Sequence, residues 1–157
     1  MQELCIKMLN DRGVRLEDIV ECVIYLQAGY NSAMNPEETM EDVLSILDKR
    51  EVQNTIMTGI AIDIAVEQKS FGNEQIRDII AVDEGLYGID EVLAYSICNL
   101  YGSIALTNFG YIDRVKPGII GVLNEEHEGR CNTFIDDIVG AIAAAAASKS
   151  AHKRRGV

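Results

Sequence analysis

Apolar residues recur at helical spacing along most of the chain. Between Leu16 and Gln27, for example, they fall at Leu16, Ile19, Val20 and Val23, which is the repeat of one helix face. The same criterion predicts helices over residues 1–12, 16–27, 52–66, 76–82 and 92–106. A further helix begins at Asn35-Pro36, a capping residue followed by proline, and bends near 49–52. We expect loops at 29–32, 67–74 and 107–110.

The most apolar segment lies near the C-terminus. Residues 138–147 carry no charge, so a helix there can be buried on all sides. Strand signals are scarce, because the chain has no Asn-Gly or Asp-Gly turn and no sustained alternation of apolar and polar residues. The 157 residues suit one domain. We therefore predict a single all-α domain, residues 1–157, in which an apolar helix from Thr133 to Ser148 is central and several others surround it.

Charge and targeting signals restrict the classes of function. A net charge of −11 argues against a nucleic-acid partner, since binding phosphates requires clustered Lys and Arg. We find no transmembrane span and no secretory signal, and so expect a cytoplasmic protein. The basic cluster at 152–155 should extend into solvent, with peripheral contact to an anionic membrane as the alternative. Cys22 and Cys98 lie among apolar residues and are predicted to be buried thiols.

Acidic residues stand beside the apolar helices. Asp136 and Asp137 open the C-terminal helix, and a carboxylate that leaves water needs a cation or strong donors. Hard oxygen ligands suit Mg²⁺, and Lys116, three residues after Asp113, is placed to neutralise a phosphate oxygen. Acids in a first turn also complement the helix dipole, so both interpretations fit these residues alone. Two upstream pairs are further candidates, Asp83-Glu84 and Asp90-Glu91.

Two of these segments carry a resemblance to a known family. Asp113-Arg114-Val115-Lys116-Pro117 and Thr133-Phe134-Ile135-Asp136-Asp137-Ile138-Val139-Gly140 resemble the D-x-x-K-P and D-D-I-x-A-G signatures of the phosphatidylglycerophosphatase A family. Asp90-Glu91-Val92-Leu93-Ala94 resembles its D-E-x-x-G element, with Ala94 in place of glycine, and Asp83-Glu84-Gly85 is a competing match. The resemblance covers residues 83–147, without the membrane spans of better-known members, and is therefore to a soluble branch.

The resemblance implies a Mg²⁺-dependent phosphatase that converts phosphatidylglycerophosphate to phosphatidylglycerol and phosphate. By the same resemblance, Asp113, Asp136 and Asp137 are candidate catalytic groups and Lys116 a phosphate contact. The candidate metal ligands are Asp90, Glu91, Asp136 and Asp137, with Asp83 and Glu84 as the alternative upstream pair. The expected partner is a phosphorylated small molecule or a lipid headgroup.

Two other functions are compatible with parts of the sequence. Glu37, Glu38 and Glu41 match the E-E-x-x-E pattern of all-α Mg²⁺-dependent nucleoside triphosphate pyrophosphatases, although acids at a helix start are expected for the dipole alone. A non-catalytic helical oligomer, whose acidic pairs only cap helices, is the third hypothesis. The apolar surplus of many short helices leads us to expect a homo-oligomer in any case.

Overall fold

The computed structural model describes residues 1–30, 34–125 and 127–154. These residues form nine helices and no strand, so the all-α prediction is confirmed. Two predicted features, the loop positions 31–32 and basic Arg155, lie outside the described residues. The helices are α1 (Gln2–Asp11), α2 (Leu16–Gln27), α3 (Pro36–Leu47), α4 (Arg50–Glu67), α5 (Glu74–Ala81), α6 (Ile89–Cys98), α7 (Ser103–Val115), α8 (Ile119–Asn124) and α9 (Ile135–Arg154).

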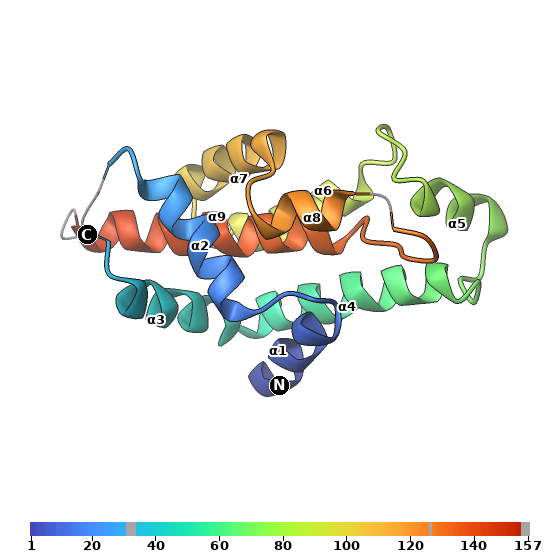
Figure 1. Cartoon of the computed structure of the whole chain (residues 1–157), viewed down its shortest axis with the longest axis horizontal. Coiled ribbons are helices and arrows are strands. Elements are labelled where there is room, and N and C mark those ends of the chain that lie inside the picture. Colours follow the sequence, from blue (N-terminus) through green and yellow to red (C-terminus); the bar gives the residue numbers. More distant parts are fainter. Residues whose placement is uncertain (31–33, 126, 155–157) are drawn as a thin grey trace.

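Helix α9 runs through the middle of the molecule, as Figure 1 shows, with α7 and α8 along one side and α3 and α4 along the other. It packs against α2, α3, α4, α6, α7 and α8. Every residue from Ile135 to Ser148 is buried. The run Ala143–Ala147 has side chains small enough for neighbouring helices to approach on all faces. The predicted central helix is therefore confirmed.

Close contact between α4 and α9 depends on Gly59. A Cβ atom added to Gly59 would lie 2.2 Å from Cδ1 of Ile138 and 3.3 Å from Cβ of Phe134. Ile138 lies in the first turn of α9 and Phe134 directly precedes the helix. The backbone of α4 reaches both only because Gly59 has no side chain. This glycine consequently sets the position of α4 against the helix end that carries the paired aspartates.

Replacing Gly59 with alanine is expected to destabilise the fold by about 1–3 kcal/mol, because the added methyl overpacks a filled interior. Gly110 is a matched control, since it lies inside α7 and a methyl added there would meet nothing within 4 Å. Gly110→Ala should stabilise by about 0.5–1 kcal/mol through helix propensity. Urea unfolding of both variants measures the difference. Equal effects would contradict the contact described.

Two expectations about the middle of the chain are wrong. A single helix over 92–106 was expected, but α6 ends at Cys98 and α7 begins at Ser103. Gly102 makes the break, with a left-handed φ of 92° that other residues rarely adopt. The expected loop at 107–110 lies inside α7 instead, because burial of Phe109 against α9 outweighs the poor helix propensity of its neighbours.

The C-terminal basic residues also differ from expectation. The cluster was expected to extend into solvent, but α9 continues through Arg154. Lys153 pairs with buried Asp42 of α3, and Arg154 donates to the side chain of Gln27. These contacts hold the end of the helix in place. Cys22 and Cys98 are buried, as predicted, and among the described residues no helix is long and apolar enough to cross a membrane.

Candidate functional site

The paired aspartates lie in the first turn of α9 and are almost completely buried. Asp136 is 3% and Asp137 4% exposed. The backbone N–H of Asp137 donates to Oδ1 of Asp136 at 2.8 Å, which satisfies one of the free donors of the helix start. The local sequence therefore places two carboxyl groups inside the fold, where each needs a charged or hydrogen-bonding partner.

Lys116 and Asp113 come from the end of α7. The helix stops at Val115, and Lys116 adopts a left-handed φ of 53° before Pro117, which has no N–H to continue the helix. This turn directs the ammonium group back: Nζ donates to Asp113 at 3.0 Å and to Asp136 at 3.4 Å. The ammonium group of Lys116 thus links the two motifs, because it contacts Asp113 in the first and Asp136 in the second. Lys116 and Asp136 are twenty residues apart in the sequence.

Helix α6 supplies the upstream acids. Gly88, with a φ of 77°, starts this helix, and Asp90 and Glu91 stand in its first turn. The carboxyl of Asp137 lies within hydrogen-bonding reach of those of Asp90 and Asp113. Partial burial, and the charges of Asp113 and Asp90, raise the pKa of Glu91. The Asp90-Glu91 pair therefore lies beside the acids of α7 and α9.

Asp83 joins the same cluster from the loop before α6. It adopts a left-handed φ of 49°, which is uncommon for a residue with a side chain. Burial of part of the group and the charge of Asp90 raise the pKa of Asp83, while Lys116 lowers it. Glu84 makes no polar side-chain contact within the described ranges. The sequence offered the two upstream pairs as alternatives. In the structure both pairs contribute to the cluster, because Asp90 is close enough to raise the pKa of Asp83.

Positive charge is scarce at this cluster. Burial raises the pKa of both Asp136 and Asp137, the nearby Lys116 opposes the shift at Asp136, and the charge of Asp136 reinforces it at Asp137. Burial alone would lower the pKa of Lys116, but the charges of Asp136 and Asp113 outweigh it and raise the pKa. Among the described residues, one lysine thus faces several carboxyl groups, so the site has excess negative charge that a further cation would stabilise.

The donor set is chemically suited to a hard cation, because it consists of carboxylate oxygens. No three His, Cys, Asp or Glu side chains within residues 1–30, 34–125 and 127–154 are arranged to hold a metal ion as they stand. The acids are therefore close neighbours without forming a preformed coordination shell. Burial and the charge of Asp136 raise the pKa of Asp137, so these crowded acids favour the binding of a proton or of a cation.

A polar cleft opens beside the cluster. It has a volume of about 560 Å³, and Asp83 lies in its wall. The loop before α6 forms one side, and residues leading from α8 to α9 form the other, including Asn124, His127, Arg130 and Asn132. The acid cluster thus borders a cavity large enough for a phosphorylated headgroup.

The glutamates of the alternative metal pattern lie elsewhere. Glu37, Glu38 and Glu41 are exposed at the start of α3, and α3 packs near the Lys153 end of α9. Asn35 caps that helix by accepting from the N–H of Glu37 at 2.8 Å. These acids fit the dipole interpretation.

Sequence reasoning missed one buried acid at the site. Asp63 of α4 is fully buried and bonds to the backbone just before the paired aspartates. A lone acid within the apolar run Ile60-Ala61-Ile62-Asp63-Ile64 was the available signal, because an unpaired charge in an apolar helix is costly.

Comparison with known proteins places the chain in a family. The model of the phosphatidylglycerophosphatase A family matches residues 8–152. Two Bacillus subtilis (strain 168) proteins, both described as uncharacterized, are similar: YutG is 51% identical, with 94% of this chain and 88% of YutG covered, and YpjQ is 49% identical, with 97% and 85% covered.

Solved structures agree with the fold. A protein of unknown function from Bacillus stearothermophilus is 52% identical, with a TM-score of 0.93 over 98% of this chain and 94% of its own. The low temperature requirement C protein from Listeria monocytogenes is 48% identical, with a TM-score of 0.95 over 98% and 96%. The resemblance noted over residues 83–147 thus extends along nearly the whole sequence. The chain belongs to the phosphatidylglycerophosphatase A family.

Proposed function

We propose that this protein is a Mg²⁺-dependent phosphomonoester hydrolase whose substrate is phosphatidylglycerophosphate. The observation that carries the proposal is the meeting of Asp113, Lys116 and Asp136 in one hydrogen-bonded group. The charges of Lys116 and Asp113 act on Asp83, which lies in the wall of the polar cleft. Carboxylates with a single lysine suit a site that binds a divalent cation together with a phosphate. Family membership supports the same class of reaction.

Several side chains can share the binding of the cation. Asp90, Asp136 and Asp137 are the buried acids of the cluster, and Glu91 and Asp83 lie at its edge. When bound, Mg²⁺ would neutralise phosphate charge and favour attack by water. Burial and mutual repulsion raise the pKa values of Asp136 and Asp137, and a bound cation would relieve that repulsion while displacing their protons.

Lys116 is the proposed phosphate contact. Its ammonium has three donors, and Asp113 and Asp136 accept two of them. The remaining donor can bind a phosphate oxygen while the two carboxylates fix the position of Nζ. In the reaction, water adds to phosphorus as the bond to the lipid oxygen breaks, so the leaving oxygen must gain a proton. The carboxyl groups of Asp113, Asp136 and Asp137 are the candidate proton carriers.

Exposed apolar side chains favour a lipid substrate over a small soluble one. Val82, Leu86, Ile89 and Val92 are exposed, and Leu86 is 91% so. They alternate along the chain with Asp83, Asp90 and Glu91 of the cluster. Apolar surface next to a phosphate site suits a headgroup that remains attached to acyl chains.

A substrate panel tests the proposal. Purified protein with Mg²⁺ should release inorganic phosphate from phosphatidylglycerophosphate in detergent at least about tenfold faster, in kcat/KM, than from glycerol 3-phosphate, because apolar contact adds binding energy. Chelation of Mg²⁺ should stop release. Faster hydrolysis of the soluble ester would overturn the lipid assignment. Release of pyrophosphate from nucleoside triphosphates, lost in Glu38→Gln, would establish the pyrophosphatase alternative instead.

A further inference from the structure

The start of α9 is buried, and the side chains of the two residues just before it do not cap it. The residue before the helix is Phe134, which offers no hydrogen-bond acceptor in its side chain. Thr133 is not available either, because its hydroxyl donates to the carbonyl of Ile80 at 2.6 Å. Free N–H groups at a buried helix start are costly unless another part of the chain accepts them.

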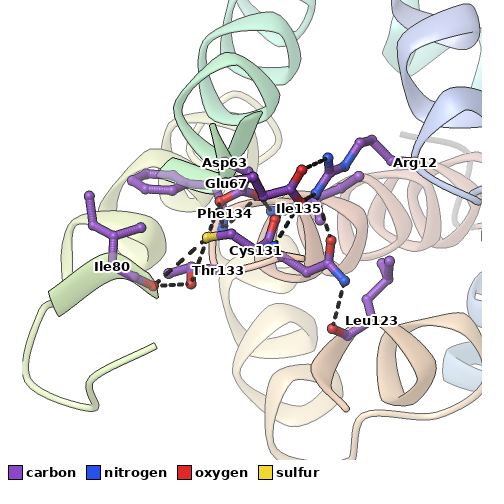
Figure 2. A network of polar contacts seen from close by, with 10 residues as sticks. Arg12, Asp63, Glu67, Ile80, Leu123, Cys131, Thr133, Phe134 and Ile135 are labelled. Atoms are coloured by element: carbon purple, nitrogen blue, oxygen red, sulfur yellow. Dashed lines mark hydrogen bonds and ion pairs between the residues drawn. The ribbon is translucent and has the colours of Figure 1, made fainter. Parts of the chain in front are cut away.

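Asp63 of α4 supplies the missing acceptors. Oδ1 accepts from the N–H of Phe134 at 3.0 Å, and Oδ2 accepts from the N–H of Ile135 at 3.0 Å. Figure 2 shows this carboxylate against the chain just before the helix. Asp63 is 0% exposed, and the thiol of Cys131 also donates to Oδ1 at 3.5 Å. The next residue along the chain is Asp136, and the first-turn acids are therefore fixed from a helix seventy-one residues earlier.

A second carboxylate and an arginine hold the same segment. Glu67, one helical turn after Asp63, accepts from the N–H of Cys131 at 2.7 Å. Arg12, from the turn after α1, donates to both oxygens of Glu67. It also donates to the carbonyl of Cys131 at 2.6 Å and to the side chain of Asn132 at 3.0 Å. Figure 2 shows these contacts converging on residues 131–135.

We infer that Asp63 is a positioning residue for Asp136 and Asp137, and that Arg12 and Glu67 assist it by fixing the segment before α9. Two carboxylates on one face of α4 bind three backbone N–H groups of residues 131–135. Because these bonds replace a cap, losing one lets the first turn of α9 fray and moves the paired aspartates relative to Lys116. The catalytic consequence rests on the function proposed above.

The test compares Asp63→Asn with Asp42→Asn. Asp42 is also a buried acid and comes from another helix, but it binds Lys153 at the opposite end of α9. Both changes should lower the melting temperature. Only Asp63→Asn should raise amide hydrogen exchange at residues 136–138, by at least about tenfold, because only it frees the first turn. It should also lower kcat for phosphatidylglycerophosphate by about ten- to a hundredfold, with a smaller change in KM.

Equal exchange at residues 136–138 in the two variants would overturn the inference. If the wild-type protein releases no phosphate, the proposed function fails, yet the exchange comparison still decides whether Asp63 positions the helix start. Glu67→Gln is the second variant in case Asp63→Asn does not fold. It keeps an acceptor for Cys131 but loses the ion pair with Arg12, so a smaller rise in exchange at the same residues is expected, and no rise would count against the inference.

Discussion

Replacing Asp137 with asparagine is expected to reduce Mg²⁺-dependent phosphate release by at least about a hundredfold while leaving the fold intact. The carboxyl of Asp137 lies within hydrogen-bonding reach of Asp90 and Asp113, so it stands between the acids of α6 and α7. Removing one preorganised polar group from a catalytic site costs on the order of 10²–10³ in kcat. Steady-state phosphate release with saturating Mg²⁺ measures the effect.

The fold should survive because asparagine resembles the protonated acid. Burial and the charge of Asp136 raise the pKa of Asp137 far above its ordinary range, and an amide N–H can donate to a neighbouring carboxylate as a protonated acid does. Asp42→Asn is the matched control, since that acid is also buried but lies at the other end of α9. Full activity in Asp137→Asn would remove this residue from the site, whereas equal loss in both variants would point to a general structural effect.

The metal-free protein is expected to become less stable as pH rises from about 5 to 8. Burial raises the pKa of Asp63 and of Asp136 to about 7. An acid whose pKa is higher in the folded than in the unfolded state binds more protons when folded. Its stabilisation is complete below the unfolded pKa of about 4 and is lost as pH rises through the folded value.

Thermal unfolding in the presence of a chelator measures this dependence. Since one pKa unit corresponds to about 1.4 kcal/mol, and 1 kcal/mol shifts the melting temperature of a domain this size by about 2–4 °C, a fall of at least about 5 °C is expected. Adding Mg²⁺ at pH 8 should recover part of the loss, because a ligand that binds only the folded state stabilises it. A melting temperature that stays constant or rises between these pH values would contradict the burial of uncompensated acids.

The fold was largely predictable because its central element has an unambiguous pattern. An uncharged run such as 138–147 can only be buried on all sides, and the structure surrounds it with helices. The ends of the helices in the middle of the chain were harder to predict. Gly102 ends one helix while Gly110 lies inside another, and sequence alone does not distinguish them, because the difference depends on which neighbouring residues pack against α9.

The candidate site was predictable only where motif and geometry coincide. Asp113, Lys116 and Asp136 were expected together and are joined by hydrogen bonds. The upstream pairs could not be separated from sequence, because the left-handed turn that brings Asp83 toward Asp90 has no clear signature. Asp63 was missed because its partners are backbone N–H groups about seventy residues away. Contacts to the backbone produce no motif of side chains that could be recognised in the sequence.

The acids of α6, α7 and α9, together with Lys116, are proposed to form one metal-dependent phosphate site. The most direct measurement is the release of inorganic phosphate from phosphatidylglycerophosphate by the purified protein, with Mg²⁺ and after its removal, in the wild type and in Asp113→Asn. The wild type is expected to release phosphate only with Mg²⁺, and the variant is expected to lose at least about a hundredfold in rate. Release that persists without divalent cations, or that Asp113→Asn leaves unchanged, would contradict the proposal.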